Sequence, residues 1–310
     1  MIVYERYDGK SNLKKFLIYS GIALAVIGIS ALGGVWFVKS YNAKAIAKIN
    51  NINQIVNQNM LEENVEDQDS GEEEQEMEEV KPKELSFPVY GENAKNNMEN
   101  IYKADSDEKI AYLTFDDGPS SNITPQILQT LENENIKATF FVLGSRVDLY
   151  PNLVKQEYDA GHYIANHGYS HDYKSVYSSA QAIIDEFNRT ESAIQKAIEK
   201  TDYHSYLFRF PGGSEGGKYS KVKDAAKKVL TENNIAYINW NALTRDAEGK
   251  PTKESIINDL KSTAEGKNRI VVLMHDAGTK QLTADTLPEV IAYLRGQGYT
   301  FKNFYDIMCE

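Results

Sequence analysis

Two neighbouring aspartates, Asp116 and Asp117, and three of the five histidines, His167, His171 and His275, stand out by residue type and spacing. One carboxylate and two neutral imidazoles can hold a divalent metal and leave positions open for water, as catalytic zinc sites require. Such a metal lowers the pKa of the water and polarises a carbonyl. A second carboxylate could then take a proton from the water, and a further histidine could protonate the leaving group. These residues predict a metal-dependent hydrolase.

Each feature also has an ordinary structural explanation. The stretch 116–118 could form a turn, because Asp and Gly favour turns. His167 and His171 could share a surface face, Arg209 could be a structural ion-pair partner, and His275 could be a buried, hydrogen-bonded histidine. Short motifs match by chance often, so no single one decides the function. The argument for function is their common position in the predicted fold.

The C-terminal two thirds of the chain have the pattern of an α/β protein. Short apolar runs alternate with amphipathic helical stretches, and the runs are nearly unbroken, as strands buried on both faces should be. The runs are 110–115, 138–142, 163–165, 207–210, 235–240, 270–274 and a weaker one at 299–301. Seven strands with intervening helices indicate a parallel α/β architecture. An open doubly wound sheet and a closed barrel both fit this count.

The unusual polar residues come at the C-terminal ends of these predicted strands, where parallel α/β folds build their active sites. In chain order they are Asp116 and Asp117, His167 and His171, Arg209, Asp246 six residues past Trp240, and His275. The other two histidines, His162 and His204, lie before or between strands and look structural.

Residues 16–38 form an uncharged apolar run bounded by lysines. A helix of that length spans about 34 Å, enough to cross a bilayer. A cleaved signal peptide is the alternative, but the run is longer than the apolar region of a signal peptide and continues through residues 35–38. We therefore predict a transmembrane anchor at 16–38 and a short cytoplasmic N-terminus at 1–15. The catalytic part would then be extracellular.

Residues 39–107 are predicted to be a stalk and a largely disordered acidic linker. Residues 61–80 contain eleven Asp or Glu and no Lys or Arg, which accounts for the whole net charge of −11. A segment with so little apolar content cannot bury a hydrophobic core, and its like charges extend the chain.

No basic patch remains in the rest of the sequence, so nucleic-acid binding is not expected. Cys309 is the only cysteine, which excludes an intramolecular disulfide.

The residues at the strand ends closely resemble the motifs of the polysaccharide deacetylases, also called carbohydrate esterase family 4 or the NodB-homology group. The resemblance covers residues 109–304, and the motifs recur in the family order. It implies a distorted (β/α) barrel of about seven parallel strands, which resolves the choice left open by periodicity.

The resemblance also implies a role for each matching residue. Asp117, His167 and His171 resemble the metal ligands. Together they would bind one divalent ion, Zn²⁺ or alternatively Co²⁺ or Ni²⁺. Asp116 resembles the catalytic base, Arg209 the arginine that orients it, His275 the general acid and Asp246 the aspartate that tunes that acid. The candidate substrate-binding residues are Leu273, which would line the pocket for the acetyl methyl group, Gly212 and Trp240.

Three positions depart from the family pattern. Gly168 stands where the family has Ser or Thr, which removes one hydrogen bond that braces the loop. Gly212 replaces a Tyr after Pro211, which keeps the backbone N–H used for the oxyanion but removes a side-chain wall. Ala247 stands where many members have Trp. These departures concern substrate fit rather than reaction type.

The resemblance predicts a deacetylase catalytic domain at 108–310. It would act on N-acetylglucosamine units of a cell-surface polysaccharide such as peptidoglycan, held at the membrane by its N-terminal helix. Two alternatives remain: an O-acetyl esterase on xylan or another polysaccharide, and a catalytically inactive glycan-binding module. The complete set of metal ligands, base and acid argues against the inactive module, because binding alone needs no metal site.

Overall fold

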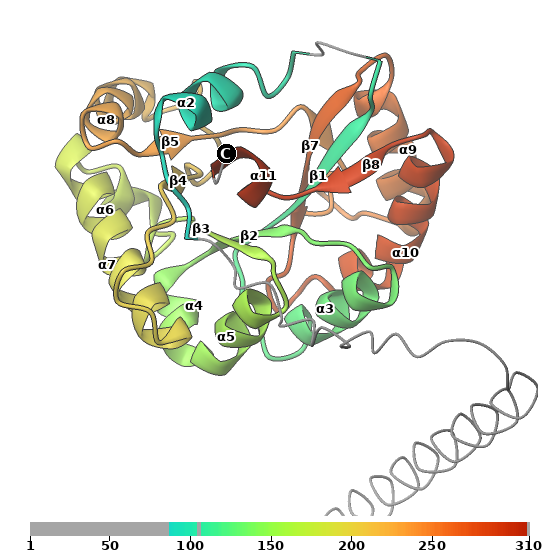
Figure 1. The fold of residues 1–310 in the computed structure, drawn as a ribbon, viewed down its shortest axis with the longest axis horizontal. Coiled ribbons are helices and arrows are strands. Elements are labelled where there is room, and N and C mark those ends of the chain that lie inside the picture. The colour runs from blue at the N-terminus through green and yellow to red at the C-terminus, as the bar shows by residue number, and fades with distance from the viewer. Residues whose placement is uncertain (1–86, 104–106, 309–310) are drawn as a thin grey trace, which may run out of the picture. The chain divides into compact units, whose positions relative to one another are not determined.

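The computed structural model describes residues 87–103 and 107–308, which lie in a folded unit that runs from Pro82 to Glu310. Strands and helices alternate along the chain, and the helices surround the strands (Figure 1). The strands are β1 (Ile110–Asp116), β2 (Thr139–Val142), β3 (Tyr163–Asn166), β4 (Leu207–Phe208), β5 (Ala236–Tyr237), β6 (Ala242–Leu243), β7 (Arg269–His275) and β8 (Thr300–Lys302). The helices are α2 (Glu92–Glu99), α3 (Thr124–Asn133), α4 (Gly144–Leu149), α5 (Pro151–Asp159), α6 (Tyr173–Val176), α7 (Ala180–Ile198), α8 (Ser220–Glu232), α9 (Lys253–Ala264), α10 (Gln281–Gly296) and α11 (Tyr305–Met308).

All strand pairs are parallel, and the strand order is β5-β4-β3-β2-β1-β7-β6. The last strand, β8, pairs with Ile110–Tyr112 of β1, whereas β2 pairs with Thr114–Asp116 of the same strand. Among the described residues no ladder joins β5 to β6, so the sheet is a distorted (β/α) barrel that stays open on that side. This confirms the predicted parallel fold. The additional strand β6 has only two residues, too few for a periodic pattern to show.

Side chains of β1 alternate between two cores. Leu113 and Phe115 pack outward with the surrounding helices, whereas Ile110 and Tyr112 pack inward with the barrel interior. Every residue of the strand is buried. Because both faces are covered, the strand reads as an unbroken apolar run, as predicted.

Local signals mark where several helices begin. α3 and α5 carry Pro125 and Pro151 in their first turn, where a missing backbone N–H costs little. At α9 the Thr252 and Ser255 side chains form a reciprocal capping box. These starts fix the loops that lead from the strand ends back into the helices.

The interior of the barrel is closed at one end by α2 and the C-terminal segment. Met98 and Ile101 are buried there with Phe304 and Tyr112. The rings of Phe304 and Tyr112 lie 5.5 Å apart. The predicted domain start at 108 placed α2 in the linker 39–107, but the structure makes this helix part of the folded unit, because its apolar face fills the barrel.

The remaining N-terminal predictions fall outside the described residues. These are the segments 1–15 and 16–38 and the acidic linker up to residue 86, and Cys309 lies outside them as well. Within the part that the structure describes, no helix has the length and apolar character needed to cross a membrane.

A buried carboxyl group without partners lies on the inner face of α5. Glu157 is fully buried, and neither of its side-chain oxygens has a hydrogen-bond partner. Burial raises the pKa of Glu157 well above its ordinary value, and the negative charge of Asp276 raises this pKa further. Ionising this group in the folded protein is therefore costly.

We expect Glu157→Gln to raise the free energy of unfolding at pH 8 by about 1–3 kcal/mol, because an amide cannot ionise and each unit of a carboxyl pKa shift is worth about 1.4 kcal/mol. The pKa of Glu157 is higher in the folded state than the value of about 4.3 in the unfolded chain. The protonated carboxyl therefore contributes its full stability below about pH 4.3, and this contribution is lost as pH rises toward the folded-state pKa. The gain measured by urea unfolding should therefore be larger at pH 8 than at pH 5. The exposed Glu232→Gln is the control, and an equal gain at both pH values would contradict the ionisation argument.

Candidate active site

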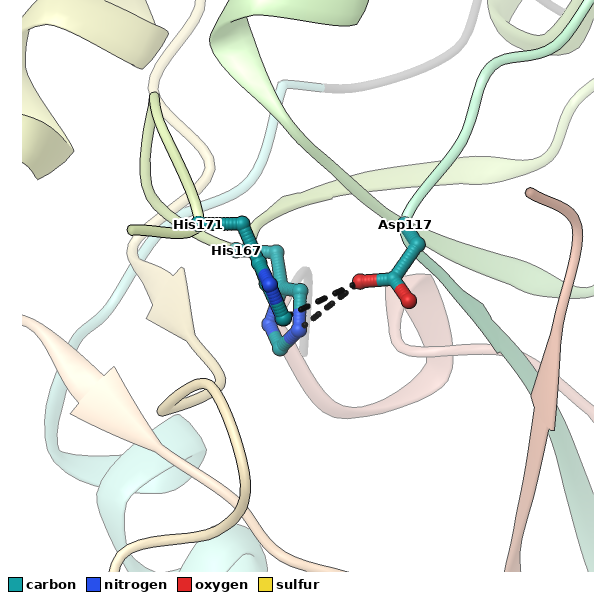
Figure 2. Close-up of side chains that lie close together, drawn as sticks. All are labelled: Asp117, His167 and His171. Carbon is teal, nitrogen blue, oxygen red and sulfur yellow. Dashed lines mark ion pairs between the residues drawn. The ribbon is translucent and has the colours of Figure 1, made fainter. Parts of the chain in front are cut away.

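Three side chains from two loops converge at the C-terminal edge of the sheet. Asp117, His167 and His171 each offer a ligand atom, and these atoms lie within 4.8 Å of one another. Oδ1 of Asp117 lies 3.5 Å from Nε2 of His167 and 3.3 Å from Nε2 of His171 (Figure 2). That oxygen is buried and has no hydrogen-bond partner. A shared point faced by an unpartnered carboxylate oxygen is what a cation site requires.

The hydrogen bonding of His167 supports this fit. Its Nδ1 lies 2.8 Å from the backbone carbonyl of Arg209, which can only accept, so Nδ1 carries the proton. Burial lowers the pKa of His167 to about 3 and outweighs the opposing charge of Asp117. The ring is therefore neutral, and its bare Nε2 faces a carboxylate oxygen. Two acceptors facing each other need a cation between them, and a neutral imidazole is the form that binds metals.

Unusual backbone conformations aim two of the three candidate ligands. Asp117 has φ 73° and His171 has φ 55°, a region that residues with a side chain rarely adopt. Along an extended strand, Asp117 would face away from Asp116, but its left-handed conformation turns its carboxylate back to the site. Such strain persists only where the surrounding structure holds it, and it is common at functional sites.

A carboxylate on α7 braces the loop between the two histidines. Oε2 of Glu186 accepts the backbone N–H groups of Tyr169 at 2.6 Å and Ser170 at 2.7 Å, and Oε1 accepts the Ser170 hydroxyl at 2.8 Å. A Cβ on Gly168, which has φ 83°, would lie 3.4 Å from Glu186 Oε2. The bracing that a Ser or Thr at 168 would supply is thus provided by Glu186, which sequence reasoning missed.

A buried ion pair holds the candidate base. Nη1 of Arg209 donates to Oδ1 of Asp116 and to Oγ1 of Thr114, each at 2.8 Å, and the side chains of Arg209 and Asp116 are both buried. Burial raises the pKa of Asp116, and the charge of Arg209 opposes this shift. The second oxygen, Oδ2, lies 3.8 Å from Nε2 of His167 and so faces the metal-binding cluster.

The candidate acid has its own carboxylate partner. Nδ1 of His275 lies 2.9 Å from Oδ1 of Asp246, and the His275 backbone N–H donates to Oδ2 of the same group at 2.9 Å. Thr283 also donates to Oδ2, at 2.8 Å. Burial opposes charging of His275, but the hydrogen bond and charge of Asp246 outweigh it and raise the His275 pKa to about 9. His275 pairs in register with Asp116 on the neighbouring strand, so acid and base lie side by side.

The three predicted substrate-binding residues lie around this centre. Leu273 is buried two residues before His275 on β7, and so on the same face of the strand. Gly212 is exposed after β4. Trp240 lies beside the next residue, since a Cβ on Gly213 would be 3.2 Å from its ring.

Sequence reasoning did not identify Tyr173 as a residue of the site. Its ring centroid lies 5.5 Å from that of His171, and its hydroxyl lies 2.7 Å from the place where a Cβ on Gly212 would be. Tyr173 therefore occupies the wall that a side chain at 212 would form. The available signals were the missing side chain at 212 and the tyrosines at 169, 173 and 177, which are spaced by one helical turn.

Comparison with known proteins agrees with this geometry. A family model described as polysaccharide deacetylase matches residues 103–234. The peptidoglycan-N-acetylglucosamine deacetylase PgdA of Listeria monocytogenes is 34% identical over 210 residues, which cover 68% of this chain but only 41% of that protein. A peptidoglycan-N-acetylglucosamine deacetylase of Bacillus cereus is also 34% identical, over 67% of this chain and 92% of the relative.

A solved structure extends the likeness to the fold. The catalytic domain of peptidoglycan N-acetylglucosamine deacetylase from Eubacterium rectale aligns with a TM-score of 0.57 at 34% identity. The alignment covers 63% of this chain and 88% of that domain. The chain belongs to the polysaccharide deacetylase family.

Proposed function

We propose that the protein is a metal-dependent hydrolase that removes acetyl groups from N-acetylglucosamine units of peptidoglycan. The observation that carries the proposal is the pairing of Asp116 with Arg209 and of His275 with Asp246, beside the Asp117–His167–His171 cluster. A held base and a held acid next to a cation site are the parts that amide hydrolysis needs. The names of the relatives from Listeria and Bacillus support this substrate.

Asp117, His167 and His171 would hold the metal ion. Two imidazoles and one carboxylate favour Zn²⁺, with Co²⁺ and Ni²⁺ as alternatives, because these ions prefer donors of intermediate softness. When bound, such an ion polarises the acetyl carbonyl and makes the attacking water more acidic.

Asp116 acts as the base through its Oδ2 atom. Arg209 occupies Oδ1, so Oδ2 is the oxygen left to accept a proton from the attacking water. Burial raises the pKa of Asp116, which makes the carboxylate a stronger base than an exposed aspartate. Arg209 keeps that carboxylate ionised and fixed in direction, so the proton acceptor is ready before the substrate binds.

His275 acts as the acid through Nε2. Its Nδ1 proton is held by Asp246, so the proton available for transfer is the one on Nε2. A pKa of about 9 keeps the imidazolium protonated at neutral pH. The departing sugar amine receives this proton as the carbon–nitrogen bond breaks, which avoids expulsion of an amide anion.

Residues 16–38 would anchor the protein in the cell membrane as a single span, with the catalytic domain outside. The uncharged apolar run supports this placement. The acidic segment 61–80 would keep the catalytic domain at a distance from the bilayer, because like charges extend it. A cell-wall glycan lies on that side of the membrane and within such reach.

Acetate release by the full-length, Zn²⁺-loaded protein tests the proposal. We expect release from N-acetylated peptidoglycan that a chelator abolishes and added Zn²⁺ restores. O-acetylated xylan is the comparison substrate. A clear preference for xylan would identify an O-acetyl esterase, and glycan binding with no acetate from either substrate would identify a binding module.

The two neighbouring aspartates should fail in different ways. Asp116→Asn should keep its metal but lose turnover by about 10²–10⁴-fold, the usual contribution of a general base. Asp117→Asn should lose metal affinity first, and excess metal should partly restore its rate. Metal content measured beside the rate distinguishes the two cases. If Asp116→Asn loses the metal while Asp117→Asn retains it, the two roles are exchanged.

The alkaline limb of the pH–rate profile should report His275. The acid must be protonated, so activity should persist at neutral pH and fall as pH rises through about 9, the pKa of His275. Asp246→Asn removes the charge that raises this pKa, so the limb should move down toward the ordinary value of about 6.5. The exposed Asp185→Asn is the control and should leave the limb in place. A limb that stays near pH 9 in Asp246→Asn would rule out His275 as its source.

A further inference from the structure

The loop after β4 presents a backbone N–H group that nothing in the described chain accepts. Gly212 is exposed, has φ 70°, and its N–H donates to none of the acceptors in residues 87–103 and 107–308. By contrast, the next N–H, that of Gly213, donates to the Phe210 carbonyl at 2.8 Å. The resemblance to the polysaccharide deacetylases implies that this N–H is the one that faces the developing oxyanion of the acetyl group.

Buried side chains hold the carbonyl groups of the two residues that flank Gly212, Pro211 and Gly213. The Tyr177 hydroxyl donates to the Pro211 carbonyl at 2.6 Å, and Nζ of Lys223 donates to the Gly213 carbonyl at 2.6 Å. Tyr177 is 2% exposed and Lys223 is 5% exposed. Tyr177 follows α6 and Lys223 lies on α8, so two separate elements meet at this loop.

Lys223 is an unusual choice for such a contact. Burial lowers the pKa of Lys223, which shows that its charge is held at a cost. Its ammonium lies 5.1 Å from the centre of the Tyr177 ring, so the two residues also contact each other. A buried lysine that serves one carbonyl and one ring indicates that the position of that carbonyl matters.

The planarity of the peptide bond links the Tyr177 contact to Gly212. The Pro211 C=O and the Gly212 N–H belong to one rigid peptide unit and point in opposite directions. A hydroxyl that fixes this carbonyl therefore fixes the direction of the N–H. The same hydrogen bond polarises the peptide unit, which makes its N–H a stronger donor.

Tyr173 closes the outer side of the loop. Its hydroxyl would lie 2.7 Å from a Cβ at Gly212, so no larger residue fits there without displacing it. The Tyr173 ring lies between His171 and Tyr177, with centroid distances of 5.5 Å and 5.7 Å. A continuous row of rings thus connects a metal ligand to the residue that holds the Pro211 carbonyl.

We infer that Tyr177 and Lys223 are positioning residues that aim the Gly212 N–H at the acetyl carbonyl oxygen. Tyr177 also strengthens this N–H as a donor to the oxyanion. The inference rests on the proposed function, because it assigns a part in acetyl transfer to water. Both act through the backbone: Tyr177 through the Pro211–Gly212 peptide unit, and Lys223 through the next but one unit, Gly213–Ser214, whose carbonyl it holds.

The test uses the full-length, Zn²⁺-loaded protein and the variants Tyr177→Phe and Lys223→Met. The matched control is Tyr203→Phe, which removes an equally buried tyrosine hydroxyl that donates to the Ile164 carbonyl at 2.6 Å. Loss of one oxyanion donor costs about 10²–10³-fold in turnover, so weakening that donor should lower kcat by about 10-fold. KM for peptidoglycan and the metal content should stay unchanged. The control should keep its kcat despite losing the same kind of bond.

A second measurement reads the peptide unit directly. Pro211–Gly212 is the only Pro–Gly pair in the sequence. Labelling proline with ¹³C at the carbonyl and glycine with ¹⁵N therefore gives one carbonyl–amide correlation in a nuclear magnetic resonance spectrum. We expect this peak to shift in Tyr177→Phe and in Lys223→Met, and to stay in place in Tyr203→Phe.

The outcomes separate the inference from the proposed function. An unmoved peak, or a kcat that falls equally in Tyr203→Phe, would overturn the positioning role. Loss of metal in Tyr177→Phe would overturn it too, because the effect would then act through the metal site. A wild-type protein that releases no acetate would refute the proposed function, and the peak would still decide whether Tyr177 and Lys223 hold the Gly212 amide.

Discussion

The buried guanidinium of Arg209 is the interaction on which the rest of the site depends. It donates to Asp116 on β1 and also to the carbonyls of Ile238 and Asn239, which lie on the unpaired side of the barrel after β5. The backbone carbonyl of Arg209 accepts the Nδ1 proton of His167. One residue thus holds the candidate base, orients a candidate metal ligand and supports the opening between β5 and β6. Removing it would leave a buried carboxylate without compensation, which typically costs about 3–5 kcal/mol.

The two-residue repeat of the strands explains why these groups meet. Tyr112, Thr114 and Asp116 alternate along β1 with outward residues such as Phe115, so Asp116 ends the inward row. His275 ends the corresponding row of β7. The interior rows are apolar near the closed end and become polar at the opposite edge. A polar residue that continues an inward row is therefore placed in the site by the same geometry that buries the core.

This repeat is also the reason that much of the site could be predicted from the sequence. Strand ends and polar residues are local features, and the shared edge of a parallel sheet converts them into proximity. The packing of α2 through Met98 was not predicted, because a short amphipathic helix after an acidic segment has no local sign of its partner. Glu186, Tyr177 and Lys223 were missed for a related reason. They act on backbone groups of distant loops, and a backbone donor or acceptor leaves no mark in the sequence.

The environments of His167 and His275 shift the pKa of the same kind of side chain in opposite directions. Both rings are largely buried, and burial lowers the pKa of each. One difference lies in the group that accepts the Nδ1 proton. A neutral carbonyl faces His167, whose pKa stays at about 3, and the ring can bind a metal. A carboxylate faces His275, whose pKa reaches about 9, and the ring can donate a proton. The groups that accept the Nδ1 protons, the Arg209 carbonyl and the Asp246 carboxylate, therefore contribute to opposite protonation states in the two histidines.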